Sequence, residues 1–110
     1  MAIKANLSID QGADFITTLN VTDDDGTPMD LTGYTGEAQM RKHYTSLTYY
    51  SFDVTIPTPP NGEVSLSLPA NTTNAIPPGR YVYDCELTSG AGKRSRLVEG
   101  IVTINPQVTR

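Results

Sequence analysis

Hydrophobic and polar residues alternate along most of the chain, in runs of strand length separated by turn signals. A period of two is the pattern of a β-strand that buries one of its faces. The fifth run shows it most clearly, because Val64, Leu66 and Leu68 face inward while Ser65 and Ser67 face outward. The pattern predicts seven strands, at residues 5–9, 14–22, 35–42, 49–56, 63–68, 79–88 and 94–104.

Turn-forming residues lie between these runs, at 23–26, 61–62, 77–79 and 89–92. Gly and Asn provide the positive φ of tight turns, and Pro fixes φ and removes a backbone donor. Inside the last strand, Gly100 predicts a bulge or the close approach of a neighbouring backbone. Residues 69–76 predict one helical turn that brings Ile76 under the edge of the fold.

Seven short strands with Gly and Pro turns predict a single domain, residues 1–110, that ends in a short extended tail at 106–110. The expected fold class is all-β: an Ig-like antiparallel β-sandwich of about seven strands with at most one short helical turn. The spacing Gly79-x-Tyr81 supports it. It resembles the corner of immunoglobulin-like sandwiches where a tyrosine hydroxyl bonds back to upstream backbone.

The charge balance is acidic, with 8 Lys and Arg residues against 12 Asp and Glu residues, which argues against a nucleic-acid-binding surface. No apolar stretch is long enough for a membrane helix, and the N-terminus lacks the apolar region of a signal peptide. With a lone cysteine, Cys85, and a single histidine, His43, we expect no internal disulfide, no structural zinc and no cofactor.

Three carboxylates are the strongest candidates for acid–base chemistry. Asp84 and Glu86 share one face of the sixth predicted strand, and Glu99 lies on the seventh, so pairing of these strands brings them together. The alternative, which we favour, is a solvated outer face on which arginines neutralise them. The arginines available to it are Arg80, Arg94 and Arg96.

Two further patterns are weaker. The acidic turn at 23–25, with Asp30 beyond it, resembles a calcium loop, but position 12 of a loop that begins at Asp23 is Tyr34 instead of the glutamate required. We therefore favour a hairpin turn, and calcium binding there stays open. Cys85 and His43 do not form a nucleophile–base pair in this pattern, because Cys85 alternates with inward-facing apolar residues.

Tyrosines gather in the middle of the chain, at positions 34, 44, 49 and 50. Tyr is favoured at protein interfaces because it offers a rigid apolar area with a polar tip. Residues 43–50 mix Tyr, Ser and Thr in a predicted loop. Contact with a partner and simple closure of the end of the sandwich are both open for these tyrosines.

Several segments carry a resemblance to a known family. They read IDQGADF at 9–15, VTDDDGTPMDLTGY at 21–34, QMRK at 39–42, GRYVYD at 79–84 and VEGIVTI at 98–104. The chain resembles small β-sandwich virion proteins of tailed bacteriophages, of the cyanophage type, and is similar to the N-terminal Ig-like domain of phage baseplate upper proteins. The Asp30-Leu31-Thr32-Gly33 stretch before a strand that ends in Arg-Lys is typical of that opening.

The resemblance implies a non-enzymatic structural or accessory protein of the virion, assembled in the host cytoplasm. It would dock onto larger subunits of the tail, baseplate or neck, in multiple copies of a symmetric assembly. The alternatives are a capsid decoration (cement) protein and a receptor- or carbohydrate-binding module of a fibre.

We expect partner contacts from the first strand, from the tail and from the loop at 43–50, because sheet edges and end loops can pair with neighbours. The residues expected to make these contacts are Tyr44, Tyr49, Tyr50, Leu7, Ile9, Val108 and Arg110.

Overall fold

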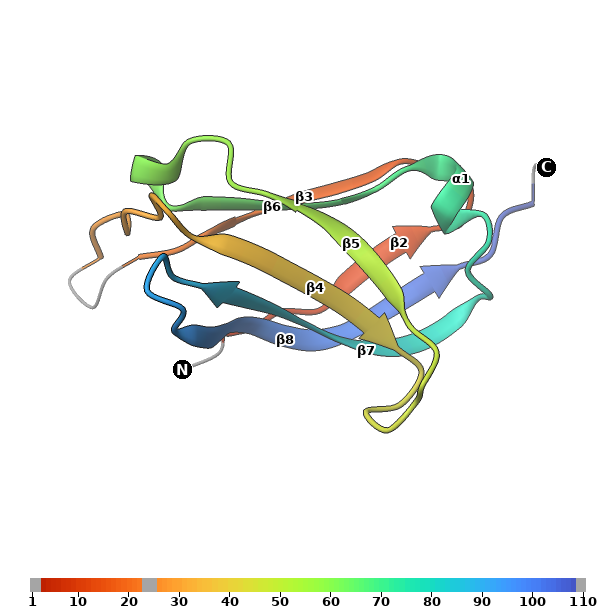
Figure 1. Ribbon diagram of the computed structural model, residues 1–110. Helices are drawn as coiled ribbons and strands as arrows, with labels where there is room; N and C mark the ends of the chain where they lie inside the picture. Colours follow the sequence, from red (N-terminus) through yellow and green to blue (C-terminus); the bar gives the residue numbers. More distant parts are fainter. Residues whose placement is uncertain (1–2, 23–25, 109–110) are drawn as a thin grey trace.

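The computed structural model of the chain describes residues 3–22 and 26–108. Strands dominate, and two short helical turns lie between them (Figure 1). The strands are β1 (Ile3–Lys4), β2 (Leu7–Asp10), β3 (Phe15–Asn20), β4 (Thr35–Arg41), β5 (Tyr50–Thr55), β6 (Glu63–Leu68), β7 (Gly79–Thr88) and β8 (Arg94–Asn105). The helical turns are η1 (Pro59–Asn61), a 3-10 helix, and α1 (Ala70–Thr73).

The strands follow one path, β1-β8-β7-β4-β5-β6-β3, and β2 also pairs with β8. The path turns at β5. Its first half pairs with β4, with Tyr50 opposite Met40, and its second half pairs with β6, with Val54 opposite Leu66. One strand therefore belongs to both layers, and the layers stack face to face as a sandwich (Figure 1).

The all-β fold class predicted from the sequence is confirmed, and from β3 onward the strand limits lie within two residues of those predicted. The N-terminal segment differs. The strand predicted at 5–9 corresponds to β2 at residues 7–10, the two-residue strand β1 precedes it, and both run parallel to β8. The break between β1 and β2 falls at Ala5 and Asn6, where the Ala5 N–H still donates to the Glu99 carbonyl (3.0 Å) and Asn6 Oδ1 accepts from the Ile101 N–H (3.1 Å).

Because residue 100 is a glycine, the backbone at Ala5 can lie directly against β8. A β-carbon at this position would overlap the carbonyl oxygen of Ala5. The close approach of a neighbouring backbone, predicted from this glycine, is confirmed. That backbone is the segment at Ala5 between β1 and β2.

The core lies between the two layers and draws on every strand that has an inward face. The fully buried side chains include Ile9, Leu31, Met40, Val64, Leu66, Leu68, Ile76, Val98, Val102 and Ile104. Ile76 is buried behind α1, as predicted. Ser65 lies on the outer face, opposite Thr18, as predicted, but its neighbours leave it only 8% exposed. It lies between β3 and β5, and its hydroxyl is 3.3 Å from that of Thr18.

Candidate interaction surface

A tyrosine corner supports the end of the sandwich from which the β4–β5 hairpin projects. The hydroxyl of Tyr81, the third residue of β7, donates to the carbonyl oxygen of Pro77 at 2.7 Å. The contact bridges four residues and fixes the Pro77-Pro78 turn against the strand. Burial raises the pKa of Tyr81 above its usual value. The backward hydrogen bond expected from the Gly-x-Tyr spacing is therefore present.

The β4–β5 hairpin extends beyond the sandwich and is held in shape by Arg41 at the end of β4 (Figure 1). Its guanidinium donates to the Ser46 carbonyl at 2.5 Å and to Gln39 Oε1 at 3.0 Å, and it stacks over the ring of Tyr49 at 4.8 Å. Ser46 closes the turn, because its hydroxyl accepts from the His43 N–H at 3.0 Å. The loop is ordered by these contacts before any partner arrives.

Three large side chains of this loop are exposed. Leu47 is 93% exposed, Tyr44 75% and Tyr49 47%. Tyr50, the fourth residue of interest, is half-buried and packs edge-on against Tyr81, with ring centroids 6.2 Å apart. Of the two alternatives left open for these tyrosines, closure of the end of the sandwich holds for Tyr50, whereas Tyr44 and Tyr49 are exposed. Leu47 was missed, because one leucine among Ser and Thr carries no periodic signal.

Two depressions flank the hairpin. One, of about 590 Å³, lies between the loop and the tyrosine corner and is bordered by Leu47, Tyr50, Pro77, Pro78 and Tyr81. The other, of about 310 Å³, is polar. It lies on the outer face of β4, β7 and β8, between the exposed Tyr44 and the charged side chains of β7 and β8. Its polar lining comprises Gln39, Arg41, Asp84, Glu86 and Arg96.

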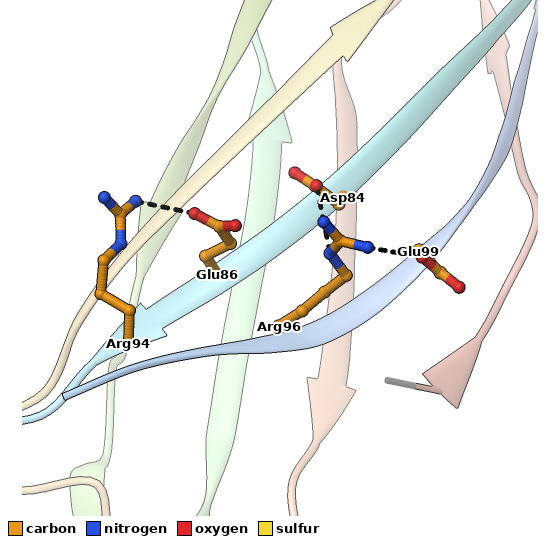
Figure 2. A network of polar contacts seen from close by, with 5 residues as sticks. All are labelled: Asp84, Glu86, Arg94, Arg96 and Glu99. Atoms are coloured by element: carbon orange, nitrogen blue, oxygen red, sulfur yellow. Dashed lines mark hydrogen bonds and ion pairs between the residues drawn. The ribbon is translucent and has the colours of Figure 1, made fainter. Parts of the chain in front are cut away.

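The carboxylates that were candidates for catalysis form an ion-paired face on β7 and β8 (Figure 2). Arg94 pairs with Glu86 at 2.7 Å, and Arg96 bridges Asp84 at 3.4 Å and Glu99 at 3.1 Å. Partial burial raises the pKa of Asp84, with Arg96 acting in the opposite sense. The prediction of a neutralised outer face is confirmed for Arg94 and Arg96.

Cys85 is completely buried between the layers, where it lies opposite Ala38 of β4 and Val98 of β8. Burial, with the nearby Asp84 and Glu86 charges as smaller causes, raises the pKa of its thiol to about 12. A thiol in this environment stays protonated and is a poor nucleophile. The inward orientation predicted for Cys85 is confirmed.

The Asp30-Leu31-Thr32-Gly33 segment forms a compact turn. Asp30 Oδ1 accepts from the Thr32 N–H at 3.0 Å and from its hydroxyl at 2.6 Å, and these bonds lower the pKa of the carboxyl. Leu31 fills the core and Gly33 adopts a φ of 83°. Asp30 is engaged within its own turn, and the remaining acids of the proposed calcium loop, at 23–25, lie outside the described residues.

Across residues 3–22 and 26–108, no three His, Cys, Asp or Glu side chains are grouped as a metal site. Over the same residues the longest helix has four residues, and no helix has the length and apolar character needed to cross a membrane.

The remaining predicted contact residues fare differently. Ile9 is fully buried, so the contact predicted for its side chain is wrong: it points into the core from β2, opposite Ile104 of β8. Leu7 is half-buried in the same strand, whereas Val108 is 95% exposed. Arg110 lies outside the described residues. The tail is tethered one residue before Val108, since Gln107 donates to Asn74 Oδ1 at 3.0 Å and its N–H donates to Gln11 Oε1 at 3.3 Å.

Comparison with known proteins adds information on the fold alone. No protein-family model matches the chain, and no curated protein matches it. Among solved structures, a mutant of the SrpA adhesin from Streptococcus sanguinis is similar, with a TM-score of 0.51 and 15% sequence identity. The match covers 92% of this chain and 55% of that chain, so this chain spans about half the length of the adhesin chain.

Proposed function

We propose that the chain is a non-enzymatic structural protein of a tailed bacteriophage particle. It docks onto larger subunits of the tail, baseplate or neck through the tip of the β4–β5 hairpin. The observation that carries the docking surface is the exposure of Leu47 and Tyr44 on a loop that Arg41 already holds in shape. The family resemblance of the sequence carries the assignment to a virion.

The hairpin has the properties of a binding anchor. Aromatic and large apolar side chains dominate the energy of protein interfaces, and a loop ordered in advance loses little conformational entropy when it binds. Tyr49, stacked on Arg41, belongs to the ordered base of the loop, while Tyr44 and Leu47 project from it. The depression bordered by Leu47 and the tyrosine corner offers a partner a recess next to the Leu47 side chain.

The non-enzymatic part of the proposal draws support from the state of the candidate catalytic groups. Glu86, Asp84 and Glu99 are held in ion pairs on an outer face. The only thiol is buried and protonated. Neither group has the accessible, activated character that general acid–base or nucleophilic catalysis requires.

A capsid decoration protein would use the same hairpin to bind a different partner. Locating the chain in the particle distinguishes this function from docking to the tail, baseplate or neck. A carbohydrate-binding module is favoured by one separate observation, the polar depression beside the exposed ring of Tyr44. A sugar could stack on Tyr44 and bond to Gln39, Arg41 and Asp84. Glycan-array binding that Tyr44→Ala abolishes would favour this function over docking.

Incorporation into particles tests the docking function. The double variant Tyr44→Ser with Leu47→Ser removes the two projecting side chains and leaves the Arg41–Tyr49 contact in place. We expect it to fold with an unchanged melting temperature and to be lost from purified particles by about tenfold or more. Ile101→Ser, at a 43% exposed position on β8, is the matched control and should assemble normally. Absence of the wild-type chain from particles, or normal incorporation of the double variant, would overturn the proposal.

A further inference from the structure

The outer edge of β3 is an open pairing surface. In the described part of the chain, β3 pairs with β6 alone and is the last strand of the sheet path. At the other end of the path, β8 is covered by β1 and β2. The N-terminal strands therefore lie against β8, and no strand of the described residues occupies the position beside β3.

The backbone groups that point outward can be identified from the register. The Val21 N–H donates to the Gly62 carbonyl at 2.7 Å, in register with the pairing of β3 and β6. Since backbone groups alternate in direction along an antiparallel strand, the odd-numbered residues of β3 bond to β6. The N–H and C=O groups of Ile16, Thr18 and Asn20 consequently point away from the sheet.

This edge lacks the features with which proteins usually block edge pairing. Its six residues, Phe-Ile-Thr-Thr-Leu-Asn, contain no charge and no proline. Its pairing with β6 runs over all six residues without a bulge. Ile16 is 73% exposed on the outer face. An uncharged edge without a bulge pairs readily with another strand.

A cavity beside the edge provides room for an incoming side chain. It measures about 270 Å³ and lies between the end of β3 and the strands of the other layer. Leu19, flanked by Thr18 and Asn20, forms one wall, and Ala5, Leu97 and Val98 form the opposite wall. The open side of the sandwich is thus apolar as well as unpaired, and an occupant must supply both a backbone edge and an apolar inward residue.

We infer that β3 pairs antiparallel with β3 of a second copy of the chain, across a two-fold axis. A second copy of β3 can occupy the position beside β3, because the strand is uncharged and its inward residues are Phe15, Thr17 and Leu19. In the register centred on Thr17, the Phe15 ring of one copy lies opposite Leu19 of the other, at the mouth of the cavity. Ile16 and Thr18 then exchange backbone hydrogen bonds across the interface, and no like charges face one another.

The dimer joins two three-stranded layers into one continuous sheet and carries two β4–β5 hairpins. It stands independently of the docking function, since β3 and the hairpin lie on different parts of the sandwich (Figure 1). If both hold, the second hairpin turns a weak contact into a bivalent one.

A matched pair of substitutions at Thr18 tests the interface. Thr18→Pro removes an outward N–H without touching the hydrogen bonds to β6, whereas Thr18→Val keeps that N–H. Both lose the contact of the Thr18 hydroxyl with Ser65, so this loss cancels in the comparison. Light scattering over a concentration series should give a dimer for the wild type and for Thr18→Val. Thr18→Pro should raise the dissociation constant about 10- to 100-fold, as expected for two lost hydrogen bonds.

Ile16→Lys provides a second route, because it places a charge on the exposed edge with the backbone intact; Ile16→Val is its control. A monomeric wild type at the highest soluble concentration would overturn the inference. So would a dimer that neither Thr18→Pro nor Ile16→Lys weakens, since its interface would lie elsewhere.

Discussion

The hydroxyl of Tyr83 donates a hydrogen bond to the carbonyl oxygen of Ala5, 2.5 Å away and 78 residues earlier in the chain. Tyr83 lies on β7 directly opposite Gly100 of β8, and Ala5 lies on the far side of β8. The phenol ring of Tyr83 therefore crosses β8 at Gly100, the one glycine of that strand. Its hydroxyl binds the segment between β1 and β2. The N-terminal strands are fastened to the sandwich at this point.

The substitution Gly100→Ala should weaken the attachment of the N-terminal strands to β8. Its β-carbon would overlap the Ala5 carbonyl oxygen, which belongs to backbone and has little freedom to move. We expect a loss of about 2 kcal/mol in the free energy of unfolding, and faster hydrogen exchange in β2. Gly90→Ala is the control, because its β-carbon meets only the Gly33 carbonyl at 3.6 Å. Its effect should stay within about 0.5 kcal/mol. Equal effects of the two variants would disprove the steric account.

Tyr83→Phe should cost about 1–2 kcal/mol at neutral pH, through loss of the bond to Ala5. Burial, with a smaller effect of Cys85, raises the pKa of Tyr83 from 10.0 to about 12. The folded state therefore favours the protonated phenol. The stabilisation is complete below pH 10 and is lost as pH rises toward 12. The stability gap between wild type and Tyr83→Phe should accordingly shrink over this range in chemical denaturation. A gap that is constant with pH would refute the assignment.

Cys85→Ser should destabilise the protein by about 1–3 kcal/mol, because the smaller, more polar hydroxyl replaces a thiol with no exposed surface. The native thiol should resist a soluble disulfide reagent until the chain unfolds. Rapid labelling of the native protein would show that Cys85 is accessible and would contradict the buried position.

Thr73→Val tests the side-chain hydrogen bonds that join α1 to the segment after β2, at the end of the sandwich where β8 ends. The buried Thr73 hydroxyl donates to the Ala13 carbonyl at 2.8 Å and accepts from the Gly12 N–H at 3.0 Å. Valine keeps the shape and loses both bonds, so we expect a cost of about 1–3 kcal/mol. Thr72→Val, at the adjacent half-buried position, should cost less than about 0.5 kcal/mol. A thermal melt of the two variants distinguishes the outcomes.

Much of the fold follows from local signals. The alternation of Val64, Leu66 and Leu68 with polar residues predicted a strand with the observed limits. The Gly79-x-Tyr81 spacing predicted the tyrosine corner. Both depend on residues close in the chain. The path of the N-terminal segment could not be predicted, because a single run of alternating residues does not reveal whether its partner is β8 or β3, nor whether it runs parallel.

The candidate surface was predictable in part for the same reason. Tyrosines in a loop are visible in the sequence, but whether a ring projects, as for Tyr44, or packs, as for Tyr50 against Tyr81, depends on a strand thirty residues later. The burial of Ile9 was missed although it lies in an alternating run, because the edge strand was expected to be available to a partner.

The most direct test of the docking function is hydroxyl-radical footprinting of the hairpin in the free chain and in purified particles. In the free chain, Tyr44 and Leu47 should be oxidised readily, since they are 75% and 93% exposed. In particles, the docking function predicts that both are protected by about tenfold or more, while Ile101 reacts similarly in the two states. A chain present in particles with Tyr44 and Leu47 as reactive as in the free protein would contradict docking through the hairpin.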